Sequence, residues 1–64
     1  YIIIMNIFKY HIGDMVECNN NDICLIIKCY LVDDHIKFYE LKSPKYNSIY
    51  YVPEYVLDEF YTKK

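Results

Sequence analysis

Residues 23–32 are Ile-Cys-Leu-Ile-Ile-Lys-Cys-Tyr-Leu-Val, the most apolar stretch of the chain. β-Branched and aromatic side chains fit the pleated surface of a sheet, so this stretch predicts a long β-strand. Successive side chains of a strand point to opposite faces. We expect the wholly apolar set to face the core, namely Ile23, Leu25, Ile27, Cys29 and Leu31. The alternate set contains a lysine, and we expect it to be only partly covered: Cys24, Ile26, Lys28, Tyr30 and Val32.

Turn-forming residues bound this strand on both sides. Asn and Asp tolerate left-handed backbone, so residues 19–22 (Asn-Asn-Asn-Asp) predict a turn. Asp33-Asp34 predicts a tight hairpin, whose turn type stays open because it contains no Gly. The hairpin leads into a further strand over 35–42, and a polar loop over 43–48 separates that strand from another at 49–52. Residues 15–18 form the strand that precedes the turn at 19–22.

The N-terminal segment is also apolar. Residues 2–10 predict an extended segment, which Gly13 interrupts because glycine permits a sharp change of direction. An apolar strand at an exposed sheet edge favours association, so residues 2–8 are a candidate homodimer contact. Met5 is a candidate natural start, which would make residues 1–4 an upstream extension. The apolar stretch is shorter than the ~20 residues of a membrane span, and it has no signal-peptide pattern, so we expect a cytoplasmic protein without a membrane partner.

The C-terminal residues 53–61 leave two alternatives open. Pro53 and Glu54 suit the first turn of a helix, and Val56, Leu57, Phe60 and Tyr61 recur at helical spacing. Lys63 and Lys64 would then follow at the C-terminus of the helix. Alternatively, one helical turn at 53–56 leads into a short fifth strand at 57–61.

Composition limits both the fold class and the function. The chain has 64 residues, of which 55% are hydrophobic, and its net charge is −2, so we expect one folded domain over residues 1–64. It contains no Ala, which disfavours a helical bundle, and no Arg, which disfavours recognition of nucleic-acid phosphates. Abundant Ile, Lys, Asn and Tyr have AT-rich codons, which points to an AT-biased genome of the phage or viral kind.

The residue types that catalyse reactions or bind metals are present without the spacing that such sites require. Cys18, Cys24 and Cys29 include no C-x-x-C pair, so we interpret them as reduced structural thiols. His11 and His35 lie outside any nucleophile motif. Two acidic pairs, Asp33-Asp34 and Asp58-Glu59, are typical of solvated surface. We therefore predict a protein that is not an enzyme, with no catalytic, cofactor or metal site.

Two segments resemble the small SH3-like barrels. Residues 8–16 (Phe-Lys-Tyr-His-Ile-Gly-Asp-Met-Val) are similar to the opening hydrophobic-Gly-Asp-x-Val segment of these domains. Residues 50–57 (Tyr-Tyr-Val-Pro-Glu-Tyr-Val-Leu) are similar to their closing strand, helical turn and return strand. The resemblance implies a mainly β, five-stranded antiparallel SH3-like barrel with a helical turn or short helix near the C-terminus. Signalling SH3 domains use an exposed Trp of their own to bind Pro-rich peptides. This chain has no Trp, so the resemblance assigns no binding residue to it.

Nine tyrosines are more than a core of this size can hold. Tyrosine is enriched at protein interfaces because it combines a large rigid ring with a polar tip. Adjacent Tyr50 and Tyr51 must point to opposite faces of one strand, so one of them points outward. The candidate partner-binding residues are Tyr39, Tyr46, Tyr50, Tyr51 and Tyr55.

Three hypotheses for function follow. The first is a non-enzymatic protein–protein interaction module, a phage or viral accessory protein that binds and modulates, or inhibits, a host or defence factor. The second is a nucleic-acid or nucleotide binder, in which lysines gather beside Tyr39, Tyr46 or Tyr50: Lys9, Lys28, Lys37, Lys42 and Lys45. The third is a minor structural component of a virion.

Overall fold

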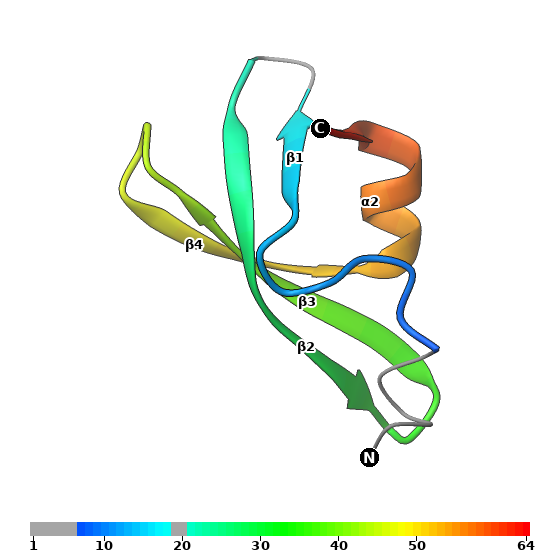
Figure 1. Cartoon of the computed structure of the whole chain (residues 1–64). Helices are drawn as coiled ribbons and strands as arrows, with labels where there is room; N and C mark the ends of the chain where they lie inside the picture. The colour runs from blue at the N-terminus through cyan, green and yellow to red at the C-terminus, as the bar shows by residue number, and fades with distance from the viewer. Residues whose placement is uncertain (1–6, 19–20) are drawn as a thin grey trace.

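The computed structural model describes residues 7–18 and 21–64, which form one antiparallel sheet with a short helix (Figure 1). The elements are β1 (Met15–Cys18), β2 (Ile23–Val32), β3 (Ile36–Ser43), β4 (Ser48–Pro53), α2 (Glu54–Phe60) and β5 (Tyr61–Lys63). The strand order is β4-β3-β2-β1-β5. This confirms the predicted mainly β class with five antiparallel strands and a helix near the C-terminus. Within the described residues β4 and β5 each pair with one neighbour, so the sheet is open.

A β-bulge divides β2 into two halves. Even-numbered residues face the core in the first half, and odd-numbered residues face it in the second. Ile26 is the Cα partner of Leu41, and Lys28 is the partner of Glu40, so Ile27 is an extra residue on the β2 side. Before the bulge, the core side of β2 consists of the fully buried Cys24 and Ile26.

The predicted core face of β2 is therefore wrong for its first half. Ile23, Leu25 and Ile27 are exposed, whereas Cys29 and Leu31 pack against the core as expected. The reason is that strict alternation along ten residues assumes an unbroken strand, and the bulge reverses the alternation at Ile27.

The predicted hairpin at Asp33-Asp34 is confirmed, and its turn type is now defined. Both residues have positive φ, 53° and 63°, and the His35 N–H donates to the Val32 carbonyl oxygen at 3.2 Å. Positive φ at both central residues is the property of a type I′ turn, whose twist matches that of the flanking strands.

Replacing Asp33-Asp34 with Asn-Gly is expected to stabilise the domain by about 1 kcal/mol. Left-handed backbone costs an L-residue roughly 1–2 kcal/mol, and Asn-Gly is the preferred type I′ pair. Thermal unfolding followed by circular dichroism is expected to show a Tm higher by roughly 4–8 °C. The control is Asp34→Ala, which keeps a Cβ in the left-handed position and is expected to lower Tm. A lower Tm for the Asn-Gly variant would contradict this account.

The N-terminal segment forms part of the core and is not a strand where the structure describes it. Residues 7–10 form bends and turns, so the extended segment predicted over 2–10 is wrong for this part, and the rest of it lies outside the described residues. Phe8 is buried, so this end of the homodimer contact predicted for 2–8 packs within its own chain; residues 2–6 of that contact, and the extension at 1–4, are not described. Gly13 has φ 98° and its N–H donates to the Ile26 carbonyl oxygen at 2.8 Å, which confirms the interruption.

The helical alternative for the C-terminal residues is confirmed. α2 spans Glu54–Phe60, with Pro53 in extended conformation at the N-cap position and Leu57 fully buried against the sheet. A fifth strand is also present, but it follows the helix and pairs with β1. Lys63 and Lys64 are therefore not helix-terminal residues: Lys63 lies in β5, and the Lys64 N–H donates to the Met15 carbonyl oxygen at 2.8 Å.

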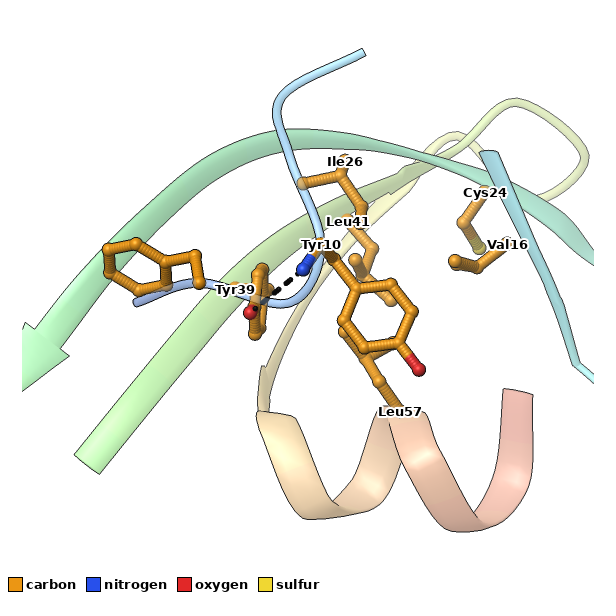
Figure 2. Packing of buried hydrophobic residues seen from close by; sticks show 8 residues of the cluster. Tyr10, Val16, Cys24, Ile26, Tyr39, Leu41 and Leu57 are labelled. Atoms are coloured by element: carbon orange, nitrogen blue, oxygen red, sulfur yellow. Dashed lines mark hydrogen bonds between the residues drawn. The ribbon is translucent and has the colours of Figure 1, made fainter. Parts of the chain in front are cut away.

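The core lies between the sheet and α2 (Figure 2). Its members are Phe8, Tyr10, Val16, Cys24, Ile26, Tyr39, Leu41 and Leu57. Tyr39 is central, because Phe8 and Tyr10 pack edge-on against its ring at centroid distances of 5.8 and 5.6 Å. The Tyr39 hydroxyl accepts the Tyr10 N–H at 3.3 Å and donates to the Glu54 carboxylate. These contacts connect the N-terminal segment, β3 and α2.

Candidate partner-binding surface

One face of the sheet points away from the core, and we call it the outer face. Its residues alternate with the buried ones along β1 to β4, so their positions follow from the strand register. Its apolar members are Met15, Ile23, Leu25, Ile27, Tyr30, Val32, Ile36, Phe38, Ile49, Tyr51 and Pro53. Its charged members are Glu17, Lys28, Glu40 and Lys42.

The outer face concentrates the exposed apolar side chains. Of the twelve large hydrophobic side chains that are exposed in the described residues, seven belong to it: Met15, Ile23, Leu25, Ile27, Ile36, Ile49 and Tyr51. α2 packs on the core side of the sheet and leaves this face open. Monomeric proteins rarely expose large contiguous apolar patches unless the patch binds a partner. The outer face is therefore the candidate binding surface.

The rim and centre of the outer face carry specific polar and aromatic contacts. The Lys28 ammonium lies 4.0 Å from the Glu40 carboxylate and 5.8 Å from the centroid of the Tyr30 ring. Tyr30 stacks on Phe38 with a centroid distance of 6.1 Å and an interplanar angle of 26°. The Lys42 ammonium donates to the Asn47 side-chain oxygen at 3.1 Å. The face thus combines rigid aromatic area with two charges of each sign.

The predicted site tyrosines divide into buried and exposed residues. Tyr39 is fully buried, so its assignment to the binding surface is wrong: its ring fills the centre of the core. Tyr50 faces the core side of β4, is partly buried, and its hydroxyl donates to the Asp22 carboxylate at 3.3 Å. Tyr51 points outward with 61% of its surface exposed. The prediction that Tyr50 and Tyr51 lie on opposite faces is confirmed.

Two further tyrosines are exposed on other elements. Tyr46 lies in the turn between β3 and β4, with the Lys45 ammonium 5.3 Å from its ring centroid. Tyr55 lies on α2 and is the most exposed of the five, at 68%. Neither belongs to the outer face as the strand register defines it. Of the predicted set, the structure therefore places Tyr51 alone among the aliphatic side chains of this face.

The aliphatic part of the surface was missed by sequence reasoning. Leu25 and Ile27 were predicted to be buried, and Met15 and Ile49 were not considered as site residues. A signal was present, because β2 is apolar on both of its faces and a core needs only one. The second apolar face is therefore left exposed, which makes it a candidate contact surface.

The candidate metal ligands and nucleophiles of the described chain are dispersed over several of its elements. No group of three or more His, Cys, Asp or Glu in that part is placed to hold a metal ion, and no pocket opens between its side chains. The three cysteines are free thiols. Burial raises the pKa of Cys24 to about 11 and also raises the pKa of Cys29, so both remain protonated at neutral pH.

The lysines named for the nucleic-acid hypothesis do not gather on one face. The Lys9 ammonium contacts the Asp58 carboxylate at 2.9 Å, and that of Lys37 contacts Glu54 at 3.1 Å, both on the helix side. Lys28 and Lys42 lie on the outer face, where Glu40 is adjacent to Lys28. Carboxylates therefore accompany three of these cations, and a basic groove beside Tyr39 is not formed.

Comparison of the chain with protein-family models, curated protein sequences and solved structures finds no match. Among the described residues, no helix has the length and apolar character to cross a membrane. The proposal for function therefore depends on the geometry of the outer face.

Proposed function

We propose that this protein is a non-enzymatic protein–protein interaction module whose binding surface is the outer face. The observation that carries the proposal is that seven exposed apolar side chains from four adjacent strands lie on the same face of the sheet. Burial of apolar surface stabilises a complex by roughly 25 cal/mol per Å², and an exposed Tyr is a typical contributor to binding energy. Tyr51, which lies beside Glu40 and is the most exposed aromatic residue of the face, is expected to contribute the largest share of that energy.

The finer proposal is a phage- or virus-type accessory protein that binds and modulates, or inhibits, a host or defence factor in the cytoplasm. It is supported by the small size of the chain, by the AT-type composition, and by three free thiols, which are typical of a reducing compartment. A small rigid domain without a catalytic site can act by occupying a surface that another protein needs. The proposed domain type is SH3-like, which the path from β4 through α2 to β5 supports.

Tyr51→Ala is expected to weaken partner binding by more than tenfold, because removal of an aromatic side chain that dominates an interface costs about 2 kcal/mol or more. The partner is first captured on tagged protein from extract of a candidate host and identified by mass spectrometry. Its affinity for each variant is then measured by calorimetric titration. The matched control is Tyr55→Ala, which removes an equally exposed ring from α2 and is expected to leave affinity unchanged.

Two outcomes would contradict this proposal. In the first, both tyrosine variants lose affinity equally, which would place the site away from the outer face. In the second, no partner is captured while oligonucleotide binds tightly.

The alternative function is nucleic-acid binding, and one observation favours it. Lysine ammonium groups lie over three tyrosine rings, of which Tyr10, under Lys9, is buried. The other two pairs, Lys28 over Tyr30 and Lys45 over Tyr46, form an arrangement that can accept a base beside a phosphate. A salt-dependent change of fluorescence anisotropy with labelled single-stranded oligonucleotide would support it. A flat titration would remove it.

A further inference from the structure

We infer that the outer face is self-complementary and that a second copy of this chain covers it in a weak dimer. The inference rests on the proposed function, because it names a partner for the same surface. A different protein that binds this face would then have to compete with the dimer. The argument comes from the order of side chains across the four strands.

Three rows of side chains cross the face, and the first of them spans β1 to β4. The first row is Met15, Leu25, Lys42 and Ile49. The second row is Lys28, Glu40 and Tyr51, and the third contains Tyr30 and Phe38. The boundary between β2 and β3 divides the first row into two and two, and it separates Lys28 from Glu40 and Tyr30 from Phe38 in the other rows.

A two-fold axis parallel to the strands, between β2 and β3, brings each row against the same row of the second copy in reverse order. Lys28 then lies opposite Glu40 of the second copy, and Glu40 opposite its Lys28. Met15 lies opposite Ile49 of the second copy. Tyr30 lies opposite Phe38 of the second copy, and Leu25 lies opposite Lys42, whose alkyl chain is the part that it can contact. The Lys28–Glu40 pair thus meets opposite charges, and the Met15–Ile49 and Tyr30–Phe38 pairs are apolar on both sides.

The charged side chains of the outer face favour a second copy of this chain over a partner that is strongly acidic or strongly basic. The strand register of β1 to β4 places two lysines and two glutamates on the outer face, and Lys64 pairs with Glu17 at its edge. The face therefore has no excess of charge large enough to attract a strongly acidic or basic protein. The Lys28 side chain is 63% exposed, while that of Glu40 is 19% exposed and 4.0 Å away. The exposed Lys28 side chain can therefore also reach across an interface, whereas the Glu40 side chain is mostly covered.

The area of the outer face limits the affinity expected for the dimer. Four strands about 4.8 Å apart and roughly 20 Å long present roughly 400 Å² of sheet per copy. Interfaces at this low end are typical of reversible complexes. We therefore expect a dimer with a dissociation constant in the micromolar range or weaker, which a tighter partner can displace.

Charge reversal and mixing test the inference. Lys28→Glu makes the central pair acidic in both copies, and Glu40→Lys makes it basic, so each variant alone is expected to lose self-association by at least about tenfold. An equimolar mixture of the two variants places acidic faces against basic faces and is expected to dimerise again. Neither variant has the Lys28–Glu40 pair within one chain, so recovery on mixing reports a contact between copies. Analytical ultracentrifugation from about 10 μM to 1 mM measures all three samples.

A second pair of variants keeps the test valid if charge reversal at Glu40 disturbs the fold. Met15→Lys and Ile49→Glu lie on β1 and β4, which two strands separate, so they cannot compensate within one chain. Circular dichroism verifies that each variant is folded, and their mixture is expected to dimerise where each alone does not.

Wild-type protein that is monomeric up to 1 mM, or folded mixtures that do not recover association, would overturn the inference. The proposed function would survive that result if Tyr51→Ala and Tyr55→Ala still differ in affinity for the captured partner. It would fail separately if they do not.

Discussion

Raising the pH from 9 to 12 is expected to unfold this domain. Burial, followed by the hydrogen bond to Asp58, raises the pKa of Tyr10 to about 12. Burial is also the largest cause for Cys24, with a pKa raised to about 11, and for Tyr61, with a pKa raised to about 12. Burial and the hydrogen bond to Glu54 raise the pKa of Tyr39 above its ordinary value of 10.0. Four neutral groups therefore resist ionisation in the folded state.

The direction of these pKa shifts determines whether stability rises or falls with pH. In the unfolded chain a Cys ionises near pH 9 and a Tyr near pH 10, whereas the folded chain holds both protonated. The unfolded state therefore binds fewer protons above pH 9, and stability falls as pH rises. The contribution of these neutral groups to the free energy of unfolding is complete below the pKa values of the unfolded chain. It is lost as the pH rises through the folded-state pKa values of about 11 and 12.

The magnitude is large compared with the stability of a small domain. One pKa unit corresponds to about 1.4 kcal/mol, so the buried Tyr10 and Cys24 each contribute on the order of 2–3 kcal/mol. Single domains have roughly 5–15 kcal/mol in total, and chains of this length lie at the low end. Far-UV circular dichroism and absorbance at 295 nm are expected to change together between pH 10 and 12. A sheet spectrum retained at pH 12 would contradict the burial of these hydroxyls.

Tyr10→Phe is the control, because it removes one titrating group. Its unfolding is expected to depend less steeply on pH above 10, even though loss of the 2.8 Å hydrogen bond to Asp58 lowers stability at neutral pH.

The strand positions were predictable because they depend on local chemistry. Strands were expected over 15–18, 23–32, 35–42 and 49–52, and the structure places β1 to β4 within one residue of these limits at each end. The Asp33-Asp34 hairpin follows from the tolerance of Asp for left-handed backbone. These features require no knowledge of distant residues.

The β2 residues of the outer face could not be assigned from the sequence, because their assignment depends on one extra residue. Nothing in the sequence distinguishes Ile27 from Ile26, yet Ile27 has no Cα partner on β3 and its insertion exchanges the two faces of β2. Both sets of β2 side chains are apolar before Lys28, so alternation alone could not assign them. Pairing with β3 decides the question, and pairing is a long-range property.

The tyrosines were ambiguous for a related reason. Tyr39 and Tyr51 both lie in strands among apolar neighbours, and composition shows only that some tyrosines exceed the core's capacity. Tyr39 is buried because β3 has a neighbour on both sides and the rings of Phe8 and Tyr10 cover its inner face. Tyr51 lies on the edge strand β4 with the opposite parity. Position in the sheet, and not residue type, separates a core tyrosine from an exposed one here.

Tyr39→Ala is expected to unfold the domain at 25 °C. The side chain is fully buried, and its loss leaves a cavity between Phe8, Tyr10 and the sheet. Replacement of a large buried aromatic residue by Ala costs about 3–5 kcal/mol, and an unsatisfied Tyr10 N–H adds about 1–3 kcal/mol. Urea titration followed by circular dichroism measures the loss. A urea midpoint equal to that of the wild type would contradict the placement of Tyr39 in the core.

Tyr39→Phe separates the packing of the ring from its hydrogen bonds, and it also separates stability from binding. The variant keeps the ring and loses the contacts of the hydroxyl with Tyr10 and Glu54, so we expect it to fold with a stability lower by about 1–3 kcal/mol. Because the Tyr39 ring is buried, the folded Tyr39→Phe variant is expected to bind the partner with the same affinity as the wild type. Tyr51→Ala is expected to do the reverse, with a urea midpoint close to that of the wild type and weak binding. If Tyr39→Phe loses affinity while it remains folded, the division between a structural core and a binding outer face is wrong.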